Sequence, residues 1–145
     1  MTPHRVFIIF LWLVALHSLC VGACLVFIPS TSAVISFFGY PYCEQNFFQK
    51  QGGVFHFIMV IIYILAIYRY RKEPVLVWLS VCAKGIGVIF LLSYFILSVQ
   101  IWSVLISGIM DLMMGLAIWA LYIRMKNAES KNNNPPTAPT TETTM

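Results

Sequence analysis

Charged residues are scarce in this chain of 145 residues: they make up 10% of it, whereas hydrophobic residues make up 60%. A soluble domain carries about 25% charged residues, so the composition argues against a soluble globular protein. The formal net charge of +4 does not indicate a nucleic-acid-binding protein, because the basic residues lie at the ends of apolar runs rather than on a solvated face. The scarcity of charge indicates a membrane protein, whose first partner is the lipid bilayer.

Motifs that carry catalytic or cofactor chemistry are also missing. The sequence contains no phosphate-binding loop, no serine–histidine–acid spacing, and no zinc or haem motif. Cys20 and Cys24 stand at positions i and i+4, which is not the C-x-x-C spacing of a redox site. The sequence leaves open whether Cys24 forms a disulfide with Cys43. We therefore predict no cofactor and no metal site, and the sequence favours a non-enzymatic role without settling the question.

The chain contains four long apolar runs. They cover residues 6–28, 52–70, 75–97 and 101–123. Each has about the 20 residues that a helix needs to cross the hydrocarbon core, and a helix satisfies its own backbone groups where water is absent. Alternating strands of a membrane β-barrel do not appear. The sequence predicts an all-α protein in which residues 1–126 form an antiparallel bundle of four transmembrane helices.

The distribution of basic residues predicts the orientation of this bundle. If all four runs span, Lys50 lies on one side and seven basic residues lie on the other: Arg5, Arg69, Arg71, Lys72, Arg124, Lys126 and Lys131. Basic residues collect on the cytoplasmic side, so both termini are predicted to be cytoplasmic, in what we expect to be a bacterial inner membrane. The outer loop should carry a short interfacial helix in "TSAVISFFGY", and the tail 127–145 should be disordered.

Each predicted span carries one ionisable residue near its middle. Counting about 1.5 Å per residue from the predicted cytoplasmic side places His17, His56, Lys84 and Asp111 roughly 15–20 Å deep, in a core about 30 Å thick. An isolated charge at that depth costs at least about 2.5–3.5 kcal/mol. Asp111 is therefore predicted to pair with Lys84, which lies on the neighbouring antiparallel helix.

Small and polar residues follow the same helix faces as these ionisable residues. Residues three or four apart share a side of a helix, and small and polar side chains mediate helix contacts in membranes, so these faces should point into the bundle. They hold Cys20 and Cys24 beside His17, Met59 and Tyr63 beside His56, Ser80, Gly87 and Tyr94 beside Lys84, and Ser107, Met114 and Gly115 beside Asp111. Among them, four hydroxyl-bearing residues are predicted to support the polar cluster: Tyr63, Ser80, Tyr94 and Ser107.

The polar cluster allows more than one interpretation. It can be structural, fixing which helices pack together and in which register, or it can bind a ligand or relay protons, since ionisable residues within membranes are functional candidates. A membrane enzyme acting on a lipid or a quinone would use His17, His56 and Asp111 for acid–base chemistry. A carrier of a thiophilic metal would use soft ligands, of which the sequence offers Cys20, Cys24, Met59, Met110, Met113 and Met114.

The membrane part of the chain resembles small four-helix proteins of the DoxX-like type. The features that carry the resemblance are Gly22 and Pro29 at the end of the first run, "FFGYP" in the outer loop, "QGG" at 51–53, Lys84 and Asp111. Such relatives are expected to have an arginine near the start of the second span, where this chain has Lys50. The resemblance implies an integral four-helix bundle, and it covers redox-linked, chaperone-like and lipid-related roles without choosing among them.

These features predict a small integral membrane protein with an accessory, binding or transport-related role. Beyond the bilayer, its expected partner is a lipid or another small hydrophobic ligand, and the sequence leaves open whether it works as a homo- or hetero-oligomer. An enzyme or a carrier needs a cavity beside the polar cluster, open to lipid or to water, whereas a purely structural cluster needs none. The presence of a cavity therefore distinguishes these interpretations.

Overall fold

The computed structural model describes residues 2–29, 36–37, 39, 47–98 and 100–133, and in these ranges the long elements are all helices. They are α1 (Pro3–Phe27), α3 (Phe47–Arg69), α4 (Val75–Leu97) and α5 (Trp102–Asn133). Each is long and apolar enough to cross a membrane, so the predicted all-α bundle of four candidate spans is confirmed. The predicted interfacial helix and Cys43 fall largely or wholly outside the described residues.

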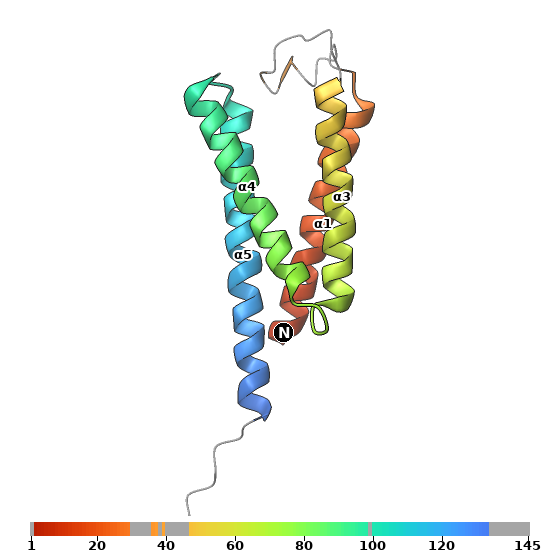
Figure 1. Ribbon diagram of the computed structural model, residues 1–145, viewed down its shortest axis with the longest axis vertical. Helices are drawn as coiled ribbons and strands as arrows, with labels where there is room; N and C mark the ends of the chain where they lie inside the picture. Colours follow the sequence, from red (N-terminus) through yellow and green to blue (C-terminus); the bar gives the residue numbers. More distant parts are fainter. Residues whose placement is uncertain (1, 30–35, 38, 40–46, 99, 134–145) are drawn as a thin grey trace, which may run out of the picture.

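The four helices form a ring in which each contacts its two antiparallel neighbours, in the order α1, α3, α4 and α5. Figure 1 shows two pairs, α1 with α3 and α4 with α5, that come together near the N terminus and diverge toward the opposite end. We call the end with the N terminus and the α3–α4 turn the basic end, because Arg5, Arg69 and Arg71 lie there. The opposite end, where α1 ends and α3 begins, is the loop end.

The α1–α3 pair is fixed at the loop end by a side chain. The amide nitrogen of Gln49, in the first turn of α3, donates hydrogen bonds to the carbonyl oxygens of Leu25 (3.1 Å) and Ile28 (3.0 Å). The last carbonyls of a helix have no partner within it, and unsatisfied backbone groups cost several kcal/mol in lipid. Gln49 thus ties the end of α1 to the start of α3.

The tail prediction is wrong for residues 127–133, because α5 continues to Asn133. The added turns contain good helix formers such as Ala128 and Glu129, and they also find a partner. The Arg71 guanidinium, in the α3–α4 turn, donates a hydrogen bond of 2.9 Å to the Glu129 carboxylate. Residues 134–145 lie outside the described part of the chain.

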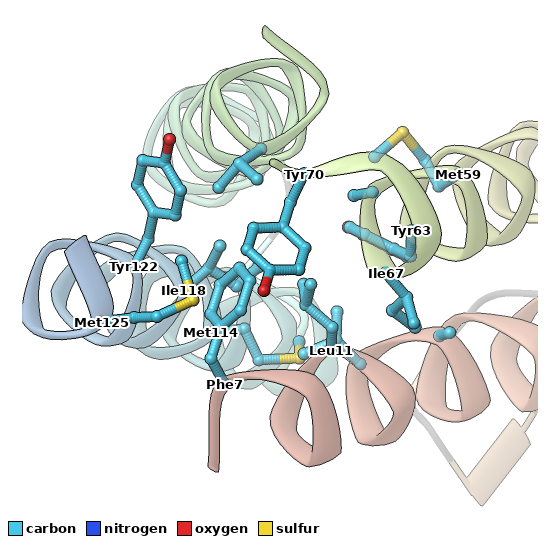
Figure 2. Packing of buried hydrophobic residues seen from close by; sticks show 14 residues of the cluster. Phe7, Leu11, Met59, Tyr63, Ile67, Tyr70, Met114, Ile118, Tyr122 and Met125 are labelled. Carbon is cyan, nitrogen blue, oxygen red and sulfur yellow. The ribbon is translucent and has the colours of Figure 1, made fainter. Parts of the chain in front are cut away.

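The apolar core is centred on the basic end, where all four helices meet. The Phe7 ring of α1 lies with its centroid 5.6 Å from that of Tyr70 and 5.8 Å from that of Tyr122. Figure 2 shows these rings with Ile118 and Met125 filling the space between the helices. Because so much apolar surface is packed here, this end holds the two helix pairs together, and the bundle is more open toward the loop end.

Candidate functional site

Lys84 of α4 and Asp111 of α5 form an ion pair inside the bundle, in which the Lys84 ammonium donates a hydrogen bond to Oδ1 of Asp111. The side chains of Lys84 and Asp111 are 6% and 18% exposed. The predicted pairing of these two residues is confirmed. It joins neighbouring antiparallel helices at a depth where neither charge is stable alone.

Two glycines make room for this ion pair. Gly87 lies one turn after Lys84, and a Cβ atom there would be 3.3 Å from Oδ2 of Asp111. Gly115 lies one turn after Asp111, and a Cβ atom there would be 3.3 Å from the Cβ atom of Lys84. Each charged residue therefore faces a glycine on the other helix, so α4 and α5 approach closely at the ion pair.

A cavity of about 270 Å³ lies beside the ion pair. Its polar wall is formed by Lys84, Asp111, His56, Ser18 and Tyr63, which come from all four helices. Its apolar wall comes from α3 and α4, with the residues Gly52, Phe55, Met59, Ala83, Gly87, Phe90 and Leu91. Phe55 and Phe90 are 56% and 65% exposed, so the cavity opens between α3 and α4 toward the outer surface of the bundle. The two helix pairs diverge on this side of the basic end, as Figure 1 shows.

Two hydroxyl groups in this wall have no hydrogen-bond partner in the part of the chain that the structure describes. Ser18 and Tyr63 are both 0% exposed, and neither oxygen atom makes a hydrogen bond. The two hydroxyls lie near enough to influence each other, but they do not meet hydrogen-bond geometry. Leaving a buried polar group unpaired costs about 1–3 kcal/mol, so both groups would be stabilised by a polar atom placed in the cavity.

The two histidines occupy different positions. His56 is half-buried and lines the cavity, whereas His17 is exposed and is not among the lining residues. Both lie near enough to Lys84 and Asp111 to interact with their charges. The structure therefore brings His56 into the predicted cluster and leaves His17 at its edge.

The predicted inward face of α1, with His17, Cys20 and Cys24, is wrong. All three residues are exposed, and α1 buries Val14, Ser18 and Gly22 instead. Gly22 meets Gly53 of α3, where a Cβ atom on Gly53 would lie 2.8 Å from the Gly22 carbonyl oxygen. The missed residue of the site is Ser18, and the signal that could have found it is its i, i+4 spacing from Gly22, a pair of small residues typical of close helix contacts.

Of the four residues predicted to support the polar cluster, one lines the cavity and three do not. Tyr63 lines the cavity, whereas Ser80 is buried elsewhere and donates a 2.9 Å hydrogen bond to the carbonyl oxygen of Leu76 in its own helix. Tyr94 and Ser107 are exposed, contrary to the prediction that they face inward. Both lie near the loop end by their positions in α4 and α5. Figure 1 shows α4 and α5 diverging from α1 and α3 toward that end.

The soft side chains weighed as metal ligands divide between exposed and buried positions, with Met59 and Met114 both in the apolar core. Cys20 and Cys24 are exposed on α1, and Met110 and Met113 are 48% and 62% exposed on α5, while Met114 is buried. Among the described residues, no group of three or more histidine, cysteine or acidic side chains is placed to hold a metal ion.

A scan of protein-family models, a search of curated proteins and a search of solved structures each gave no match for this chain. The resemblance to DoxX-like proteins therefore stays a prediction. The four apolar helices indicate a multi-pass membrane protein with a helical bundle. Its interior ion pair and the adjoining cavity are the features from which a function can be argued.

Proposed function

We propose that this protein binds a small amphiphilic molecule, drawn from the bilayer, in the cavity beside Lys84 and Asp111. The observation that carries the proposal is the cavity itself, whose polar inner wall holds the ion pair, His56 and two unpaired hydroxyls, while its mouth is apolar. Ligand sites in proteins combine these properties: a mostly apolar lining with a few polar groups that orient the ligand. The role is that of a binding or carrier protein.

The size and position of the cavity favour partial enclosure of the ligand. A volume of about 270 Å³ lies just below the range of about 300–1,000 Å³ that encloses most of a small molecule. The cavity would hold a polar head group and the first carbons of a chain. The rest of the chain would lie along exposed Phe55 and Phe90, which face the lipid.

A purely structural role explains less of this geometry. An ion pair that only set the register of α4 and α5 would need the glycines opposite it, and these are present. It would need neither an adjoining cavity nor the unpaired hydroxyls of Ser18 and Tyr63, which are contributed by the other two helices. Those two features support ligand binding.

We also propose a location in a bacterial inner membrane with both termini in the cytoplasm. The support is the excess of basic residues at the basic end and the resemblance to bacterial DoxX-like proteins. With this orientation the cavity receives its ligand sideways from the bilayer, between α3 and α4.

The test is photolabelling of the whole protein in lipid nanodiscs. The probes are dodecyl chains that carry a diazirine next to one of three head groups: a methyl ester, a sulfonate or a trimethylammonium. Gly52→Leu should fill the cavity, because a Cβ atom at Gly52 meets nothing closer than Leu25 Cδ1 at 3.8 Å. It should lower labelling of the cavity wall about tenfold for at least one probe, a change of about 1.4 kcal/mol in binding.

The matched control is Gly85→Leu, the same substitution on α4 at a position that does not line the cavity and where a Cβ atom meets nothing within 4 Å. Its labelling should equal that of the unchanged protein. If Gly52→Leu does not fold, Ala83→Leu fills the cavity from α4. Equal labelling of the filled and control variants by all three probes would refute the proposed function.

A further inference from the structure

We infer that the cavity selects an uncharged head group that accepts hydrogen bonds, in preference to an anionic or a cationic one. This inference rests on the proposed binding function and assigns the chemical class of its ligand. It follows from the charge balance of the wall, from the donors that the wall leaves unused, and from the position of the cavity in a membrane interior.

The charges in the wall already compensate each other. Lys84 and Asp111 are the lining residues, among those described, that carry a full charge, and they are paired. An anionic head group would have to compete with Asp111 for Lys84, and a cationic one would have to compete with Lys84 for Asp111. Either competition leaves one charge without a partner in a region of low dielectric constant, where separated charges are strongly disfavoured.

The unused polar groups of the wall include several donors, beside the second carboxylate oxygen of Asp111, which accepts. The Lys84 ammonium has three N–H donors and no acceptor, and its bond to Asp111 uses one of them. The hydroxyls of Tyr63 and Ser18 make no hydrogen bond with proper geometry among the described residues, and His56 adds an N–H group. A carbonyl oxygen, with two lone pairs and no charge, is suited to this set, as in an ester, a ketone or an amide.

The experiment compares the three dodecyl probes on the unchanged protein in nanodiscs. The methyl ester probe should label the wall formed by α3 and α4 at least about tenfold more than the sulfonate or the trimethylammonium probe. Sulfonate and trimethylammonium keep their charges at all accessible pH values, so the comparison does not depend on protonation of the probe.

A hydroxyl deletion tests the donors separately from the cavity volume. Tyr63→Phe keeps the ring and removes one donor, so labelling by the methyl ester should fall about two- to tenfold, as expected for one hydrogen bond. Tyr70→Phe is the matched control. Tyr70 lies two turns further along, does not line the cavity, and has a buried hydroxyl that makes no hydrogen bond with proper geometry among the described residues. Labelling of this control should be unchanged.

The outcomes separate the two proposals. Labelling by the sulfonate or the trimethylammonium as strong as by the methyl ester, and lost in Gly52→Leu, would overturn the uncharged-acceptor inference and leave the binding function standing. Equal loss of labelling in Tyr63→Phe and Tyr70→Phe would also overturn it. Labelling by every probe that is indifferent to Gly52→Leu and Ala83→Leu would refute the binding function itself.

Discussion

Lys84 and Asp111 are stable inside the bundle because each neutralises the other. A buried pair gains little over two apolar residues, since both ions must leave water, but a single ion left behind is strongly destabilising. A second ion pair lies at the basic end, where Arg69 and Glu73 have an N–O distance of 3.0 Å. Because its side chains are 61% and 45% exposed, its charges stay hydrated when separated.

The two pairs should therefore respond differently to mutation. Lys84→Leu or Asp111→Leu alone should lower the free energy of unfolding by about 3–5 kcal/mol, and the double variant should recover most of that loss because no unpaired charge remains. Arg69→Leu and Glu73→Leu should each cost less than about 1 kcal/mol. Reversible unfolding in detergent measures all of these values. A double variant whose loss equals the sum of the single losses would show that Lys84 and Asp111 are not coupled.

At the scale of helices, glycines decide how closely the elements pack. A Cβ atom on Gly53 would lie 2.6 Å from Val26 Cγ2 and 2.8 Å from the Gly22 carbonyl oxygen, so α1 and α3 would have to move apart. A Cβ atom on Gly85 of α4 would meet nothing within 4 Å. The two positions share a helical backbone and differ in what lies opposite them.

The same substitution should thus have opposite effects at these positions. Gly85→Ala should stabilise the protein by about 0.5–1 kcal/mol, because alanine loses less conformational entropy in a helix. Gly53→Ala gains the same helix propensity but should destabilise by about 1–3 kcal/mol, because α1 and α3 are overpacked. Thermal unfolding in detergent gives both signs. Stabilisation in both variants would show that α1 and α3 are not in close contact at Gly53.

At the scale of the whole molecule, the two helix pairs are joined at the basic end and diverge toward the loop end. The aromatic core of Phe7, Tyr70 and Tyr122 closes the first end. The cavity lies where the packing between the pairs becomes incomplete. The closed core at the basic end and the cavity above it are therefore consequences of one arrangement.

The orientation of the molecule in the membrane can be checked directly. Reporter fusions after Met145 and within the turn at residues 71–74 should both report the cytoplasm, because the basic residues collect on that side. A reporter inserted after Lys50 should report the opposite side. A non-cytoplasmic signal from either of the first two fusions would contradict the proposed orientation.

The sequence alone predicted the helices and the ion pair for the same physical reason. A bilayer tolerates neither free backbone groups nor a lone charge, so long apolar runs must be helical, and Asp111 needs the one basic residue within reach, Lys84. For that reason α4 runs from Val75 to Leu97, as predicted. The hydropathy pattern did not indicate how far α5 extends, because the turns up to Asn133 are polar and take part in contacts that only the folded chain provides, such as Arg71 with Glu129.

Only the tertiary structure decided which faces of the helices are buried and where space remains. α1 is apolar on nearly all sides, so no polar stripe marks its contact face. The close approach of Gly22 to Gly53 turns Ser18 inward and leaves His17 exposed. Tyr94 and Ser107 are exposed, although hydropathy and spacing place them on the same faces as Lys84 and Asp111. A cavity is a property of packing between helices far apart in sequence. Apolar side chains are stable both in lipid and in the interior of the bundle, so hydropathy does not distinguish the two faces of a helix. Hydropathy therefore cannot locate the space beside Lys84 and Asp111.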